Sequence, residues 1–184
     1  DRVMKVTWCI MKDLKKPPRP DLVHRLCMAV HRKTIFISDL HLDSHNPDVT
    51  QAFFQFLNQT DFSVVDALYI LGDLFEIWIG DDDDTPFHRT IIAALQSVTA
   101  KGVPVYFLYG NRDFLIGKNF LRKTGCQLLA EEEKISLYGT PVLLMHGDIL
   151  CTQDTKYLEV RKKMRHVFLQ TLFLLLPLYA LRLF

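Results

Sequence analysis

Ala67-Leu68-Tyr69-Ile70-Leu71-Gly72-Asp73-Leu74-Phe75-Glu76 joins an apolar run to a Gly-Asp pair. Its five leading apolar residues are typical of a buried strand in a parallel sheet. The Gly-Asp pair that follows places Asp73 just beyond the C-terminal end of this strand. Open α/β sheets bind their ligands at that end. The stretch therefore predicts a parallel sheet with a functional carboxylate at its edge.

Three other segments repeat the arrangement of an apolar run followed by polar side chains. They are residues 34–38 before Asp39-Leu40-His41, 103–109 before Gly110-Asn111-Arg112-Asp113, and 142–145 before His146-Gly147-Asp148. Each motif taken singly is common in turns. Four runs in order, each ending in oxygen or nitrogen donors, predict one divalent-metal site.

The donor types indicate which cations such a site would hold. Asp39 and His41 lie two residues apart at a strand end, so both side chains can leave the same face. A carboxylate paired with an imidazole suits Mn²⁺, Fe²⁺ or Zn²⁺ better than Ca²⁺. Asp73 has two oxygens that could bridge two cations, while Asn111 and His146 add an amide oxygen and a second imidazole. Two such cations could stabilise the attacking and leaving oxygens of a phosphoryl displacement.

Arg112 follows Asn111 directly, and its guanidinium could bind phosphate oxygens in a bidentate manner. We expect the other histidines, among them His45, His88 and His166, to be solvated or at the surface. The acidic run 81–84 is expected to be a solvated loop.

Charge is distributed unevenly along the 184 residues, although the net charge is only +1. Residues 1–33 carry a net charge of +6, residues 34–150 carry −9, and residues 151–184 carry +4. An acidic middle suits a cation-binding core and argues against a nucleic-acid partner. The four cysteines lack CxxC spacing, so neither a zinc finger nor a disulfide framework is expected.

Alternating strand and helix patterns predict an α/β layered fold. Helices are expected from Pro47 to about Gln59, from Thr85-Pro86 to Gly102, and around 117–124. Residues 133–138 and 141–146 are expected to form a hairpin, and one basic amphipathic helix is expected from Thr155 to about Gln170.

The chain divides into three parts by composition. Residues 1–27 are basic and interrupted by prolines, and are expected to be an extension outside the domain, with a membrane-surface tether as the alternative. Residues 28–154 would form the core, and residues 155–184 would begin a helical, membrane-proximal lid. The apolar segment 168–181 is too short and too interrupted by Pro177 to span a bilayer, so an interfacial patch is expected.

Together these motifs resemble those of calcineurin-like metallophosphoesterases. Residues 38–42, 68–83, 109–117 and 144–152, with the tail 169–173, are similar to the UDP-2,3-diacylglucosamine hydrolase family of lipid A biosynthesis. The resemblance covers about residues 34–181. It implies a layered α-β-β-α sandwich that hydrolyses UDP-2,3-diacylglucosamine to UMP and 2,3-diacylglucosamine 1-phosphate at the cytoplasmic side of the bacterial inner membrane.

The same resemblance implies a centre of two Mn²⁺ ions. Asp39 and His41 would hold one ion, Asp73 would bridge both, and Asn111 and His146 would hold the other. Asn111, Arg112 and Asp154 would also contact the lipid-linked nucleotide sugar. No obligate protein partner is evident from the sequence.

The sequence departs from the family pattern in one respect, because it contains no Gly-His-x-His motif. We therefore expect a fold that is incomplete at the C-terminus, with weakened metal affinity and doubtful activity. Two alternatives stay open. One is another metal-dependent phosphodiesterase or nucleotide pyrophosphatase, which has no use for the apolar lid, and the other is a non-catalytic membrane-binding remnant.

Overall fold

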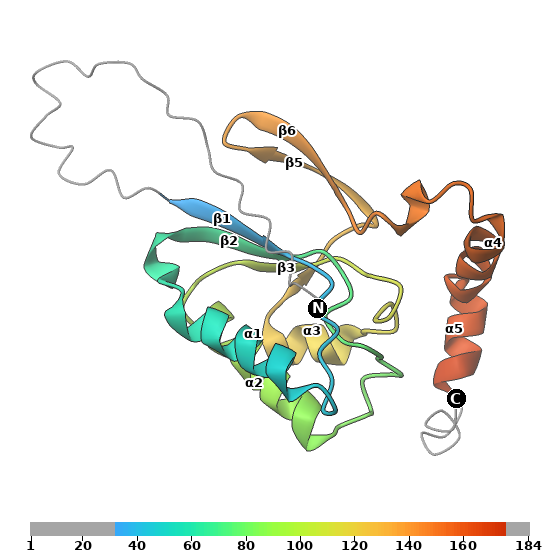
Figure 1. The fold of residues 1–184 in the computed structure, drawn as a ribbon, viewed down its shortest axis with the longest axis horizontal. Coiled ribbons are helices and arrows are strands. Elements are labelled where there is room, and N and C mark those ends of the chain that lie inside the picture. The colour runs from blue at the N-terminus through green and yellow to red at the C-terminus, as the bar shows by residue number, and fades with distance from the viewer. Residues whose placement is uncertain (1–31, 176–184) are drawn as a thin grey trace, which may run out of the picture.

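The computed structural model describes residues 32–175, which form a layered α/β structure (Figure 1). Its central sheet contains β1 (Lys33–Ile37), β2 (Val65–Ile70), β3 (Val105–Phe107) and β4 (Gln127–Leu128), in that order. All neighbouring strands in this sheet are parallel. The parallel sheet expected from the sequence is thus confirmed, and the short edge strand β4 is an addition that no apolar run had indicated.

Three helices cover one face of this sheet: α1 (Pro47–Gln59), α2 (Pro86–Thr99) and α3 (Lys118–Thr124) (Figure 1). Side chains alternate between faces along a strand, so Leu68 and Ile70 of β2 point to the same layer. They pack in one buried cluster with Phe53 of α1, Leu95 of α2 and Phe120 of α3. The larger core of the molecule therefore lies between the helices and the sheet.

An antiparallel hairpin covers the opposite face of the sheet. It consists of β5 (Glu132–Leu137) and β6 (Thr140–Met145), as expected from the sequence. Ala67 and Tyr69 of β2, which alternate with Leu68 and Ile70, pack against Leu144 of the hairpin in a second, smaller cluster. The described residues thus form α, β and β layers, and the hairpin brings the end of β6 to the C-terminal edge of the parallel sheet.

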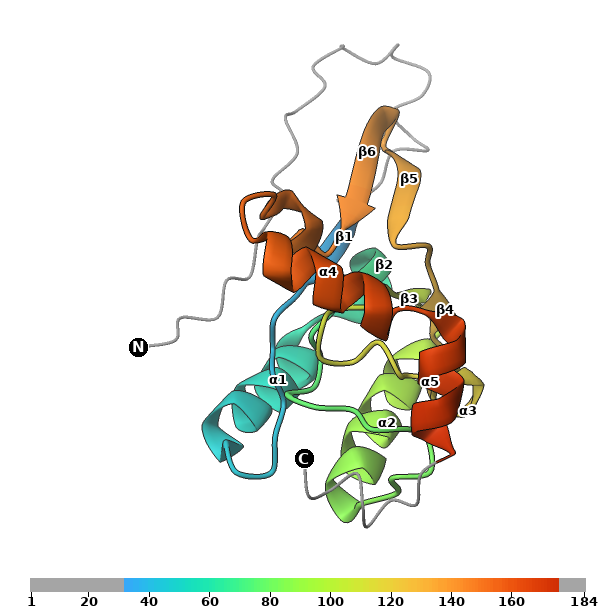
Figure 2. The same cartoon turned by 90° about the vertical axis from the view of Figure 1, so that its right-hand side faces the viewer.

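The lid segment differs from its expected form. It contains two helices, α4 (Thr155–Met164) and α5 (Val167–Leu174), rather than one helix to about Gln170. The break falls at Arg165 and His166, and the His166 side chain accepts a hydrogen bond from Phe168 N as the N-cap of α5. Because Ser, Thr, Asp and Asn are the usual N-caps, the sequence offered no strong signal for this break. Figure 2 shows α4 crossing in front of the strands.

The expected extension 1–27 and the apolar residues 176–181 lie outside the described residues. Within the described part, no helix is long and apolar enough to cross a membrane.

Candidate metal centre

The loops that follow β1 and β2 hold their polar residues in an unusual backbone conformation. Asp39, His41 and Asp73 have φ angles of 55°, 49° and 52°, in the left-handed region that residues other than glycine rarely adopt. Each residue in this conformation lowers the stability of the folded state by about 1 kcal/mol, and strained residues of this kind concentrate at functional sites. Two backbone hydrogen bonds fix the loops together, from Asp39 N to Gly72 O and from His41 N to Asp73 O.

The Asp73 loop and the loop after β3 approach so closely that both need glycine. A Cβ atom on Gly72 would lie 2.6 Å from the Gly110 backbone and 2.8 Å from His146 Nδ1. A Cβ atom on Gly110 would lie 2.0 Å from Asp73 Oδ1. These two glycines therefore bring three motifs that are distant in sequence to one place.

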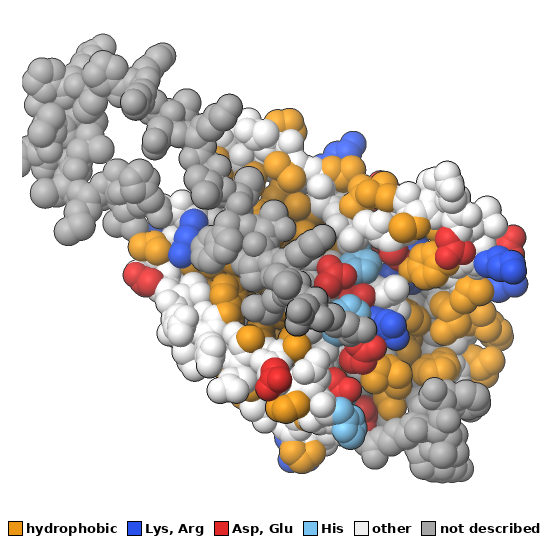
Figure 3. Space-filling view, in the orientation of Figure 1, with side chains coloured by type: hydrophobic (Ala, Val, Ile, Leu, Met, Phe, Trp, Pro, Cys, Tyr) orange, Lys and Arg blue, Asp and Glu red, His pale blue; other side chains and the backbone are white. Residues whose placement is uncertain are grey.

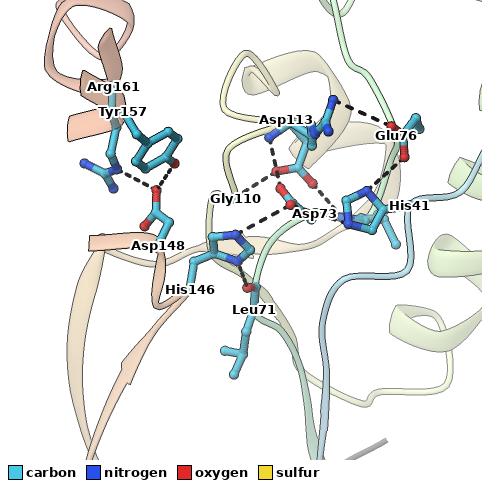
Figure 4. A network of polar contacts seen from close by, with 12 residues as sticks. His41, Leu71, Asp73, Glu76, Gly110, Asp113, His146, Asp148, Tyr157 and Arg161 are labelled. Carbon is cyan, nitrogen blue, oxygen red and sulfur yellow. Dashed lines mark hydrogen bonds and ion pairs between the residues drawn. The ribbon is translucent and has the colours of Figure 1, made fainter. Parts of the chain in front are cut away.

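Potential ligand atoms of three of the expected residues lie close together. Ligand atoms of Asp39, Asp73 and His146 all lie within 4.8 Å of one another. Asp73 Oδ2 lies 3.7 Å from His41 Nε2 and 3.5 Å from His146 Nε2 (Figure 4). One carboxylate oxygen thus faces two imidazoles from separate loops, which is the arrangement expected of a carboxylate between metal ions.

The tautomer of His146 supports a cation at this place. Its Nδ1 lies 2.9 Å from the carbonyl oxygen of Leu71, which can only accept, so Nδ1 carries the proton. In the neutral imidazole, Nε2 then presents a lone pair towards Asp73 Oδ2. Two electron-rich atoms facing each other repel unless a proton or a metal ion lies between them, and backbone-fixed tautomers are typical of metal-binding histidines. These residues therefore fit a divalent ion.

His41 lies beside a carboxylate rather than a backbone carbonyl group. Its Nδ1 lies 3.0 Å from Glu76 Oε2, although the two groups are not aligned for a hydrogen bond. Glu76 Oε1 in turn lies 3.6 Å from Arg112 Nη1. The sequence motif contains Glu76 but indicates no role for it. In the structure, its carboxylate lies between His41, a candidate ligand, and Arg112.

Asn111 also fits the role of a metal ligand. Its Oδ1 atom is buried and accepts no hydrogen bond from the described residues. An unpaired buried carbonyl oxygen is costly in free energy, and a cation would satisfy it. Arg112 N donates to Asp73 Oδ1 at 2.9 Å, while the Arg112 side chain, paired with Glu76, is about half exposed.

Asp113 lies beneath the centre and is fully buried. Its carboxylate accepts hydrogen bonds from Gly110 N and Leu74 N, and so links the loops of β3 and β2. Burial raises the pKa of Asp113 to about 6, and the charge of Asp73 adds a smaller effect in the same direction, although backbone hydrogen bonds from Gly110, Leu74 and Asp73 lower it. Its contacts make Asp113 a support for the loops rather than a ligand.

Helix α4 is anchored beside the centre by Asp148, which follows β6. Asp148 Oδ2 accepts from Tyr157 Oη at 2.7 Å and from Arg161 Nε at 2.6 Å (Figure 4). Burial by itself would raise the pKa of Asp148, but the hydrogen bonds from Arg161 and Tyr157 outweigh it and hold the pKa below its usual value. The carboxylate is therefore an ionised anchor for α4.

A second anchor lies at the C-terminal end of α4. Arg165 Nη2 donates to Gly110 O at 2.8 Å, and Nη1 lies 2.6 Å from Glu131 Oε1. The guanidinium also lies over the rings of Tyr109 and Phe114, at 5.8 Å and 5.4 Å from their centroids. None of these α4 contacts was predicted, since a basic helix alone does not specify its partners.

Asp154, expected to contact substrate, is the exposed N-cap of α4 and accepts from Tyr157 N. Between α4 and the centre lies a cavity of about 300 Å³. Its lining comprises Asn111, Arg112, Phe114, Tyr157, Val160, Arg161, Met164 and Arg165. Figure 3 shows acidic and histidine side chains in a band across this face, beside a region rich in hydrophobic side chains.

Two expectations for polar residues were wrong. His88 is buried and packs on Phe75 and Trp78. Burial is tolerated because the ring atom Nδ1 forms a hydrogen bond with Asp83 O at 2.7 Å and so needs no water. In the acidic run, Asp83 is buried, and Asp81 accepts from the Gly117, Asn119 and Phe120 amides at the start of α3. This is a capping contact across 36 residues or more of sequence, which local sequence patterns cannot reveal.

A curated relative from Klebsiella pneumoniae is 55% identical over 146 residues, covering 79% of this chain and 60% of the relative. One from Photobacterium profundum is 54% identical, covering 79% and 59%, and one from Escherichia coli is 55% identical, covering 80% and 61%. All three are named UDP-2,3-diacylglucosamine hydrolase.

The chain thus spans about 60% of the length of the relatives that it matches. The model of the calcineurin-like phosphoesterase family matches residues 32–175, which include every strand and helix described above and all five candidate ligands. The chain belongs to the calcineurin-like phosphoesterase family.

Proposed function

We propose that the chain carries the metal centre and part of the substrate site of a hydrolase that cleaves UDP-2,3-diacylglucosamine into UMP and 2,3-diacylglucosamine 1-phosphate. The observation that carries this proposal is Asp73, whose Oδ2 faces both His41 and His146 from a strained loop. Identity of about 55% to hydrolases of that name supports the choice of substrate.

Asp39, His41, Asp73, Asn111 and His146 would hold the metal, and the mixed carboxylate, imidazole and amide set suits Mn²⁺. When bound, divalent ions of this type activate water and stabilise charge on phosphoryl oxygens. The chain's own residues fix the ligands. Leu71 O sets the tautomer of His146, and Arg112 N orients Asp73.

Arg112 is the proposed contact for the pyrophosphate, because its guanidinium is about half exposed beside the ligand cluster. Asn111 lies next to it and would contact the same group. Asp154, at the start of α4, is proposed to contact the glucosamine. The cavity beneath α4 contains three arginines together with Val160 and Met164, which fits an anionic group joined to an apolar one.

The exposed face of α5 supports binding at a membrane surface. Phe173 packs against the core, whereas Phe168, Leu172 and Leu175 are 68%, 51% and 76% exposed. Exposed apolar groups on a short helix favour an interfacial contact. We therefore propose a peripheral location on the cytoplasmic side of the inner membrane, with α5 facing lipid or acyl chains.

The same apolar helix distinguishes this proposal from its rivals. A soluble nucleotide pyrophosphatase needs no such surface. A membrane-binding remnant without activity would need the surface but not the convergent ligand set.

Release of UMP from UDP-2,3-diacylglucosamine with Mn²⁺ tests the proposal, with Asp73→Asn as the variant and Asp82→Asn, an exposed aspartate of the acidic run, as the matched control. We expect the control to retain whatever Mn²⁺-dependent turnover the parent shows, and Asp73→Asn to lose at least a hundredfold of it. Equal turnover in all three proteins would contradict the role of the site. Vesicle binding without metal-dependent turnover would favour the remnant.

A further inference from the structure

A second cavity, of about 420 Å³, reaches the metal centre at Glu76, which lies beside His41. It is lined by Leu42, Asp43, Ser44, Ile77, Phe87 and His88, among others. Glu76 also lines it, and the same Glu76 lies 3.0 Å from His41 Nδ1 and 3.6 Å from Arg112 Nη1. A ligand with its phosphate at the metal centre could therefore extend past Glu76 into this cavity.

The charge of the lining indicates which part of a ligand would enter. Asp43, Glu76 and Asp83 contribute carboxylates, and none of the described lining residues is Lys or Arg. Carboxylates repel phosphates, but they accept hydrogen bonds from hydroxyl groups. The cavity thus suits a neutral group that carries hydroxyls, such as a ribose.

The apolar part of the lining adds a surface for a flat ring. The Phe87 side chain is half-buried at the start of α2, and Ile77 is 60% exposed. Aromatic side chains bind nucleobases by stacking, with little dependence on hydrogen bonds. The cavity volume also lies within the range of about 300–1,000 Å³ that is usual for small-molecule sites.

The two cavities near the ligand cluster share no lining residue and differ in charge. The one beneath α4 contains Arg112, Arg161 and Arg165, whereas the one beside α2 contains carboxylates. A nucleoside diphosphate joined to an acylated sugar has one polar, neutral end and one apolar end. The charges and the exposed α5 side chains thus favour a different cavity for each end of such a molecule.

We propose that the cavity beside α2 is the nucleoside subsite, in which a pyrimidine base lies against Phe87 and Ile77 and the ribose hydroxyls donate to Asp43. This assignment rests on the proposed function, because it takes the substrate to be a nucleoside diphosphate derivative.

Binding of UMP tests the subsite without requiring turnover. Ser44→Trp would fill the cavity, and Ser97→Trp is a matched control at an exposed serine on α2. Inorganic phosphate serves as a probe of the centre alone. We expect Ser44→Trp to weaken UMP binding at least tenfold, with phosphate binding unchanged, and Ser97→Trp to change neither. Unchanged UMP binding in Ser44→Trp would overturn the proposal.

Photo-crosslinking of 5-iodo-UMP to the unsubstituted chain gives a second test that depends on no variant. The proposal expects the crosslinked peptide to contain Phe87 and His88. A crosslink to residues 157–165 of α4 would place the base in the other cavity and overturn it. Failure of the lipid substrate to turn over would contradict the proposed function but would leave both results interpretable.

Discussion

Arg165 Nη2 lies 2.8 Å from the carbonyl oxygen of Gly110, and this hydrogen bond ties the end of α4 to the loop that carries Asn111. The guanidinium is only 11% exposed and also contacts Glu131. Removing it should release α4 and leave Glu131 without this partner. We predict that Arg165→Ala lowers the free energy of unfolding by about 1–3 kcal/mol, the scale of charge-assisted hydrogen bonds.

Hydrogen exchange distinguishes this anchor from a general loss of stability. In Arg165→Ala the amides of residues 110–113 and 155–164 should exchange faster than those of β1 and β2. Arg165→Lys should restore part of the protection, because it keeps the charge but not the planar contact with the rings. Arg89→Ala, at an arginine that is 63% exposed, is the control and should change neither region. Uniformly faster exchange would contradict a local anchor.

Gly110→Ala tests the close approach of two loops. The added methyl group would lie 2.0 Å from Asp73 Oδ1 and 2.3 Å from Asp73 N, so Asp73 must move. We predict at least a tenfold loss of Mn²⁺ affinity, measured by calorimetry.

Gly102→Ala is the control for Gly110→Ala. Nothing lies within 4 Å of its added Cβ, but its φ of +82° imposes a strain of about 1 kcal/mol on any other residue. It should therefore reduce stability without altering metal affinity. Retained affinity in Gly110→Ala would show that the two loops are not tightly coupled.

Asp81 is predicted to stabilise α3 from a distant loop. Its carboxylate accepts from three backbone amides at the start of the helix and from Trp78 Nε1 at 3.2 Å. Asp81→Ala would leave these donors without their acceptor and should cost about 2 kcal/mol in urea unfolding. Asp82→Ala, at an exposed neighbour, should cost less than about 0.5 kcal/mol. Equal effects would refute the capping role.

Local patterns were sufficient for the parallel sheet, helices α1 to α3 and the β5–β6 hairpin. They also identified the candidate metal ligands, because strand ends repeat a recognisable combination of donor residues. Contacts between distant segments were not accessible in this way. Asp81 capping α3, Arg165 binding Gly110 O and the burial of His88 all depend on how loops pack after the sheet has formed. The break between α4 and α5 was missed because His166 is an uncommon cap.

Cys126 and Cys151 should differ in their reactivity. Burial raises the pKa of the Cys126 thiol to about 11, whereas Cys151 is exposed. The thiolate is the reactive form, so a rise of about two units from the ordinary value makes it roughly a hundredfold scarcer at pH 8. Iodoacetamide at pH 8 should label Cys151 much faster than Cys126 in peptide mass spectra. Comparable rates that appear only in urea would confirm that burial is the cause.

Metal binding by Asp73 can be measured by titrating the chain with Mn²⁺ and following the free ion by electron paramagnetic resonance. We expect saturable loss of the free Mn²⁺ signal in the parent chain and in Asp82→Asn. We expect at least tenfold weaker binding in Asp73→Asn, whose neutral amide cannot bridge as a carboxylate does. Equal binding by Asp73→Asn and the parent would show that Asp73 is not a metal ligand.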